Sequence, residues 1–154
     1  MKPLIVLISV FIIAITAFKL TNKPLNYPLA GRIALSCMLM FTAIGHFIYS
    51  KGMAAMFPSL VPFRLELVVV SGLLEIAFAV GLLLPAYQQL TSWLLILFFV
   101  LVLPFNIRAA LQHINYQTGE LNGPGPAYLW FRVPLQILFI GWAYFSAIKN
   151  SILH

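Results

Sequence analysis

Charge is what this sequence lacks most. Only 8% of its 154 residues are charged, and its acidic residues number three, all of them glutamate. Soluble domains carry about 25% charged residues, so this chain has too few charges to cover a core with the polar shell that water requires. With 62% hydrophobic residues and a mean hydropathy of +1.01, the outer surface is expected to face lipid.

Cysteine is scarce too. Cys37 is the sole cysteine, which excludes an intrachain disulfide and disfavours a thiol-exchange enzyme. Neither His46 nor His113 has a second ligand one helical turn away, so the signal for a metal or haem site is weak and no metal site is predicted. The net charge of +6 comes mostly from Lys and Arg near the ends of apolar runs, and it forms no basic face for nucleic acid.

Long apolar runs are abundant. A membrane-spanning helix needs about 20 mainly apolar residues, and five stretches qualify, namely 4–20, 31–50, 65–84, 90–112 and 128–148. They do not alternate between polar and apolar residues as the strands of a membrane barrel do. The first run lacks a convincing cleavage site, so we expect it to be retained. The sequence predicts an all-α, polytopic helical membrane protein with a single transmembrane domain over 1–154.

Glu75 is the only charge between Leu67 and Leu84. A charged carboxylate at the bilayer centre costs about 3 kcal/mol on insertion scales. We therefore expect Glu75 to be protonated, to be paired with a cation such as Arg132 or Arg108, or to bond to His46. Small residues share its helical face (Ser71, Gly72 and Ala79), as close helix contacts in lipid require.

Successive membrane helices run in opposite directions, and this places further polar side chains on one side of the membrane relative to Glu75. If all five runs span, the second helix ends, the third begins, the fourth ends and the fifth begins on this side. The sequence therefore predicts a one-sided polar pocket with Glu75 at its floor. The predicted ligand-binding set is Glu75, His46, Asn106, Arg108, Arg132, Gln136 and Trp130.

Structural roles compete with this interpretation. His46 lies near an interface, where a bond to a carbonyl or a headgroup would also satisfy it. Arg108 and Arg132 are placed where they could anchor to lipid phosphates. Asn106 follows Pro104, which frees a backbone carbonyl one turn earlier, and Trp130 is typical of an interfacial anchor.

Five stretches in this order resemble the DoxX-like membrane proteins: "GRIALSCMLMFTAIGHF", "MFPSLVP", "LVVVSGLLEIAFAVGLLLP", "LPFNIRAAL" and "YLWFRVPLQ". The resemblance covers about residues 31–145. It implies a four-helix membrane bundle made of 31–50, 65–84, 90–112 and 128–148, a DoxX-like core over 31–148 to which 4–20 is an addition. The family's recurrent polar positions map to Gly45, His46, Gly72, Glu75, Asn106, Arg108 and Arg132.

The resemblance implies less about activity. Some relatives are associated with quinone-linked oxidation, and others are accessory membrane subunits. Three hypotheses follow: a binding or accessory protein whose pocket holds a small lipophilic ligand of quinone or lipid type, a quinone-linked oxidoreductase subunit, and a small proton-coupled exporter. The one-sided polar distribution argues against the exporter, which needs access from both sides.

The composition and the resemblance together predict the location of the protein, its partners and its cofactor. We expect a multi-pass protein of the cytoplasmic (inner) cell membrane, with the lipid bilayer as its main partner. A partner membrane or redox subunit and a homodimer are further expectations. A quinone is the cofactor that the resemblance suggests, and nucleic acid is not expected.

Overall fold

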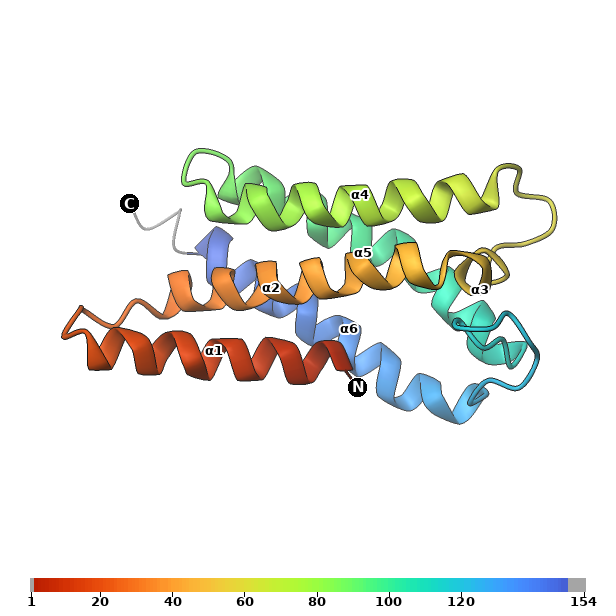
Figure 1. The fold of residues 1–154 in the computed structure, drawn as a ribbon, viewed down its shortest axis with the longest axis horizontal. Helices are drawn as coiled ribbons and strands as arrows, with labels where there is room; N and C mark the ends of the chain where they lie inside the picture. The colour runs from red at the N-terminus through yellow and green to blue at the C-terminus, as the bar shows by residue number, and fades with distance from the viewer. Residues whose placement is uncertain (1, 150–154) are drawn as a thin grey trace.

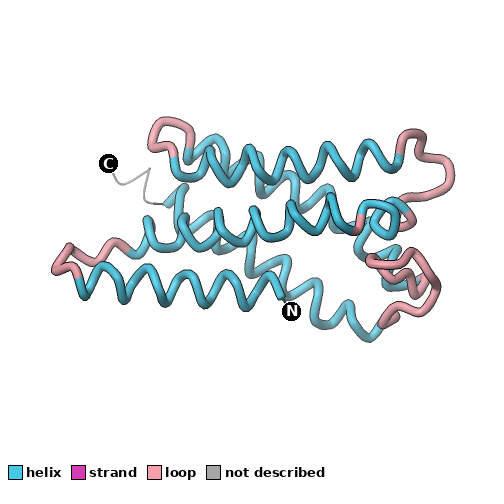
Figure 2. The backbone as a smooth tube through the Cα atoms, viewed as in Figure 1, coloured by secondary structure: helices cyan, strands magenta, loops and turns pink. Residues whose placement is uncertain are grey.

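The computed structural model describes residues 2–149. Long helices run side by side along the molecule (Figure 1), and no strand occurs within the described residues (Figure 2). The elements are α1 (Lys2–Leu20), α2 (Tyr27–Ile48), α3 (Ser50–Ala54), α4 (Arg64–Leu83), α5 (Gln88–Leu111), the 3-10 turn η1 (Pro126–Tyr128), α6 (Leu129–Ala143) and the π-helical turn η2 (Tyr144–Ile148). The predicted all-α class is confirmed.

Four helices form the bundle. Helix α2 packs on α4, α4 on α5, and α5 on α6, while α6 and η2 return to α2 and close the ring. Helix α1 lies outside this ring along α2 (Figure 1), and Phe11 meets Trp142 of α6 edge to face at 5.1 Å. Within residues 2–149, five helical segments are long and apolar enough to cross a membrane, as the sequence predicts.

Two details differ from the predicted boundaries. Helix α2 begins at Tyr27, four residues before the predicted start at residue 31. The side chain of Asn26 accepts a hydrogen bond of 2.9 Å from the Leu29 N–H, and Pro28 fits the first turn, where no backbone donor is needed. The short helix α3 begins at Ser50, the last residue of the predicted 31–50 helix, and continues into the stretch between the predicted second and third membrane helices.

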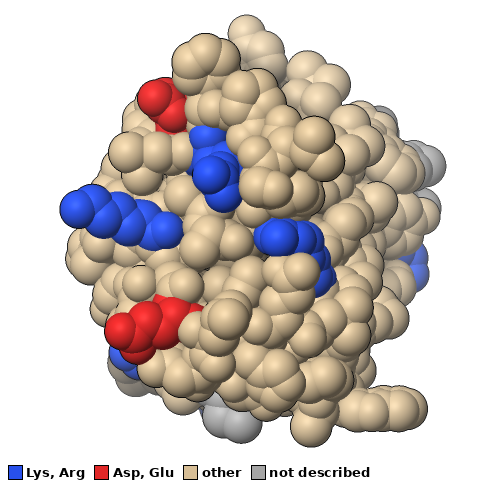
Figure 3. All heavy atoms as spheres, turned by 90° about the vertical axis from the view of Figure 1, so that its right-hand side faces the viewer, with Lys and Arg blue, Asp and Glu red and all other residues tan. Residues whose placement is uncertain are grey.

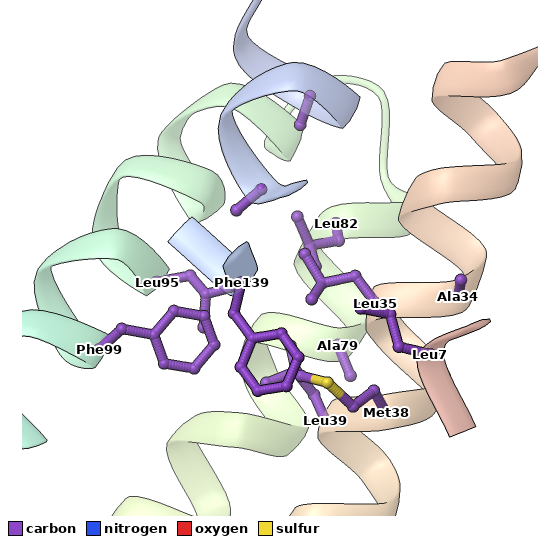
Figure 4. Close-up of a cluster of buried hydrophobic side chains, with 12 residues drawn as sticks. Leu7, Ala34, Leu35, Met38, Leu39, Ala79, Leu82, Leu95, Phe99 and Phe139 are labelled. Atoms are coloured by element: carbon purple, nitrogen blue, oxygen red, sulfur yellow. The ribbon is translucent and has the colours of Figure 1, made fainter. Parts of the chain in front are cut away.

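The apolar core fills one half of the bundle. Its buried side chains come from Leu7 of α1, the first half and middle of α2, the second half of α4, the first half of α5, the end of α6 and η2 (Figure 4). They include Leu35, Met38, Leu82, Leu95 and Phe139. These half-helices share one side of the membrane, since successive helices run in opposite directions. The other half of the bundle holds most of the polar residues that were predicted for the site.

The loops at the polar end are tied down by specific contacts. Arg108 donates to the carbonyl of Met56 at 2.7 Å. A side chain at Gly52 would run into the backbone of Tyr116, so glycine lets α3 lie against the 112–125 loop. Figure 3 shows this end of the molecule, with both basic and acidic side chains on it.

Candidate functional site

Glu75 lies inside the bundle near the middle of α4. It is about 16 Å along the helix from Arg64 and about 12 Å from Leu83, at ~1.5 Å per residue. Only 6% of its surface is exposed. Its Oε2 atom is buried and has no hydrogen-bond partner among residues 2–149. An unsatisfied carboxyl oxygen at this depth is costly, so this atom marks a candidate site.

His46 of α2 faces Glu75. Its Nε2 atom lies 3.6 Å from Glu75 Oε1, which is within ion-pair range but long for a hydrogen bond. The other ring nitrogen, Nδ1, lies 2.8 Å from Ser71 Oγ and 3.2 Å from the Val68 carbonyl oxygen. Of the partners predicted for Glu75, His46 is the one that the structure brings to it.

The hydrogen-bond partners of His46 indicate which of its ring nitrogens carries a hydrogen. The Val68 carbonyl only accepts, so Nδ1 carries a hydrogen when it bonds there. Ser71 donates its own hydroxyl to Val68 at 2.7 Å, which leaves its oxygen free to accept from Nδ1. In the two uncharged arrangements of the pair, one proton lies on either Oε1 or Nε2, which gives a neutral imidazole beside a carboxylic acid or an imidazolium beside a carboxylate. The pair is neutral in both forms, as the bilayer interior favours.

Small residues allow α2 and α4 to approach this closely. A Cβ at Gly72 would lie 2.9 Å from His46 Cβ and 3.5 Å from the Ala43 carbonyl oxygen. A hydrogen bond also joins α2 to α4 near the end of α4, where the Ser36 hydroxyl donates to the Ala79 carbonyl at 2.8 Å. Small side chains and interhelical hydrogen bonds are the usual means of helix association in lipid.

Arg132 and Asn106 form a second polar contact, between α6 and α5. Arg132 Nη1 donates to Asn106 Oδ1 at 2.8 Å. The guanidinium carbon lies 5.1 Å from the centre of the Tyr128 ring and 6.0 Å from that of Tyr116, within the range of cation–π attraction. The predicted alternative in which Arg132 pairs with Glu75 is not seen within residues 2–149.

The remaining predicted residues have other contacts. Arg108 bonds to the carbonyls of Ala55 and Met56, so it holds the loop after α3 and does not pair with Glu75. Gln136 donates to the Phe99 carbonyl at 2.8 Å. Trp130 is 86% exposed, which agrees with an interfacial anchor. Only part of the predicted set therefore shares contacts: Glu75 and His46 meet between α2 and α4, and Asn106, Arg132 and Gln136 bond between α5 and α6.

Further buried polar side chains lie outside the predicted set, in the half of the bundle that the sequence treated as apolar. They include Ser36, Thr91, Ser92 and Ser146. Within residues 2–149, the Ser92 hydroxyl and the buried Nε atom of the half-buried Arg32 have no hydrogen-bond partner. The signal that could have identified Ser36 is its spacing with Ala43, seven residues further on, which puts two small residues on one face of α2. Within the described residues, no three His, Cys, Asp or Glu side chains group closely enough to hold a metal ion.

Comparison with known proteins places the chain in a family without assigning it a role. Residues 35–147 match the family model described as "Domain of unknown function (DUF8561)". Because this match covers well over half of the chain, the protein belongs to that family. Neither the curated proteins nor the solved structures gave a match. The resemblance to DoxX-like proteins stays a prediction.

Proposed function

We propose that this protein is a DoxX-like integral membrane protein that binds a small lipophilic ligand, of quinone or lipid type, at Glu75 and His46. The observation that carries the proposal is the buried Oε2 atom of Glu75, which has no partner within residues 2–149. A ligand group that forms a hydrogen bond with Oε2 would remove the cost of burying this atom without a partner. Lipophilic ligands reach such a site through the bilayer.

The proton shared by His46 and Glu75 suits a ligand of the quinone class. A carboxylate accepts a hydrogen bond from a quinol hydroxyl, and a carboxylic acid donates one to a quinone carbonyl. The same pair can therefore meet both redox forms without adding net charge in the bilayer. A quinone-linked oxidoreductase subunit would use this pair to take up or release a proton, and it is the alternative that this chemistry favours.

The exporter hypothesis has less support. Leu35, Leu82, Leu95 and other core side chains are fully buried in the half of the bundle beyond Glu75. This apolar packing lies between Glu75 and the opposite side, and separate polar groups such as Ser36 and Ser92 are buried within it. It supports a site that is open to one side. We also propose the cytoplasmic membrane as the location.

The test is binding by the purified protein in mild detergent, with decylubiquinol and decylubiquinone as probes. Glu75→Gln should weaken quinol binding by roughly 10- to 150-fold, the range that corresponds to one hydrogen bond to a charged group. Glu120→Gln is the matched control, because Glu120 is exposed and bonds only within its loop, to Asn122 at 2.8 Å. Native mass spectrometry of the untreated protein should show a retained small molecule.

Two results would contradict the proposal. One is the absence of probe binding together with no retained small molecule. The other is equal affinity in the Glu75→Gln variant and the unchanged protein, because this result would assign the ligand to another place.

A further inference from the structure

A hollow of about 710 Å³ lies where α3 meets the start of α4. Its walls come from α3, the loop that follows it and the first turn of α4. It lies at the polar end of the bundle, just outside two membrane-spanning helices, and therefore at the level of lipid headgroups. It is separate from the Glu75 site, which is 11 residues further along α4.

Three charged side chains line this hollow: Lys51, Arg64 and Glu66. All three are exposed. None of them forms an ion pair or a side-chain hydrogen bond with another part of the described chain, residues 2–149. In a protein with so few charges, the hollow thus gathers two cations and one carboxylate that are free to bind an outside group.

Apolar surface continues from the hollow. Phe63 and Leu65 are part of its lining and are 74% and 43% exposed. The neighbouring Leu60 is 93% exposed. A ligand that places its charged end in the hollow can therefore lay a hydrocarbon chain over these side chains, which a water-soluble metabolite cannot do.

From these features we infer that the hollow binds the headgroup of a zwitterionic aminophospholipid. Lys51 and Arg64 contact the phosphate, and Glu66 accepts hydrogen bonds from the ammonium group. Phe63 and Leu65 contact the upper part of an acyl chain. Both kinds of lipid present a phosphate, but only the ammonium group brings a positive charge that offsets the charge of Glu66, so the carboxylate selects for the amine.

The experiment is native mass spectrometry of the full chain in mild detergent, titrated with phosphatidylethanolamine and phosphatidylglycerol of identical acyl chains. The unchanged protein should prefer phosphatidylethanolamine. Lys51→Gln with Arg64→Gln should weaken binding of both lipids by roughly 30-fold, about fivefold for each charge. Glu66→Gln should remove the preference while keeping binding. Lys19→Gln with Lys23→Gln, which removes two charges at the opposite end, is the control and should change neither.

Competition with glycerophosphoethanolamine distinguishes a membrane lipid from a free headgroup. This tail-less compound should displace the lipid poorly, and displacement at equal concentration would overturn the assignment to a lipid. Unchanged lipid binding in the Lys51 and Arg64 double variant would overturn the site itself. An unchanged preference in Glu66→Gln would overturn the role of the carboxylate. A circular-dichroism spectrum equal to that of the unchanged protein confirms that each variant is folded.

Discussion

Ser71 Oγ lies 2.8 Å from His46 Nδ1, so α4 holds the imidazole of α2 from one side and presents Glu75 on the other. Both partners come from a single helix, one turn apart. A small movement between α2 and α4 therefore changes the orientation of the ring and its distance to the carboxyl group together. The site depends on how closely these two helices pack.

Gly72→Ala tests that packing. The added Cβ would lie 2.9 Å from His46 Cβ, so the helices must separate, and overpacking of this kind costs about 1–3 kcal/mol. Thermal unfolding in detergent should show a lower midpoint for this variant. Gly141→Ala is the control, since a Cβ there meets nothing within 4 Å and alanine favours the helix. Equal midpoints for the two variants would contradict the close contact at Gly72.

Glu75→Gln should separate binding from folding. The carboxyl group makes no short hydrogen bond that the amide would lose, so the ligand-free variant should unfold at or above the midpoint of the unchanged protein. A saturating quinol probe at about 100 times its Kd stabilises the unchanged protein by about 2.7 kcal/mol, and this increase should be largely absent in the variant. A strongly destabilised ligand-free variant would instead indicate that Glu75 locks the bundle.

Ser36→Ala and Ser92→Ala form a matched pair in the other half of the bundle. Ser36 donates across helices to Ala79 at 2.8 Å, a contact worth about 0.6 kcal/mol on average and up to about 1.7 in membrane proteins. Ser92 is fully buried, and its hydroxyl has no partner within residues 2–149. Chemical denaturation should show a loss of stability for Ser36→Ala and none, or a gain, for Ser92→Ala. The opposite order would be inconsistent with these hydrogen-bond assignments.

The contact between Arg132 and Asn106 predicts energetic coupling. In a double-mutant cycle of Arg132→Gln and Asn106→Ala, the two single changes should be non-additive by about 0.5–3 kcal/mol. Unfolding of the four proteins in one detergent measures the cycle. As a control, Arg108→Gln combined with Asn106→Ala should be closer to additive, because Arg108 bonds to the loop after α3. Additive effects for Arg132 and Asn106 would show that the bond is weak in solution.

The side on which polar residues gather could be predicted because helix parity fixes it. Consecutive membrane helices run in opposite directions. The helix ends that carry His46, Asn106 and Arg132 therefore lie on the same side of the membrane. The boundaries were less predictable: the second membrane helix was expected to begin at residue 31, yet α2 begins at Tyr27, with Pro28 in its first turn beside the Asn26 cap. The partners of each side chain could not be predicted, since they depend on helix rotation and spacing.

The sequence by itself determined that this protein is a helical membrane protein, because five apolar runs with so few charges can be satisfied only in lipid. It also shows that Glu75 lies near the middle of one of these runs. The tertiary structure decided that His46 is its partner, that Arg132 bonds to Asn106, and that Arg108 holds a loop. The physical reason is that composition and hydropathy are properties of a single helix. A hydrogen bond between two helices depends on the rotation of each helix about its axis and on the distance between them, and it forms only when the donor and acceptor come within hydrogen-bond distance.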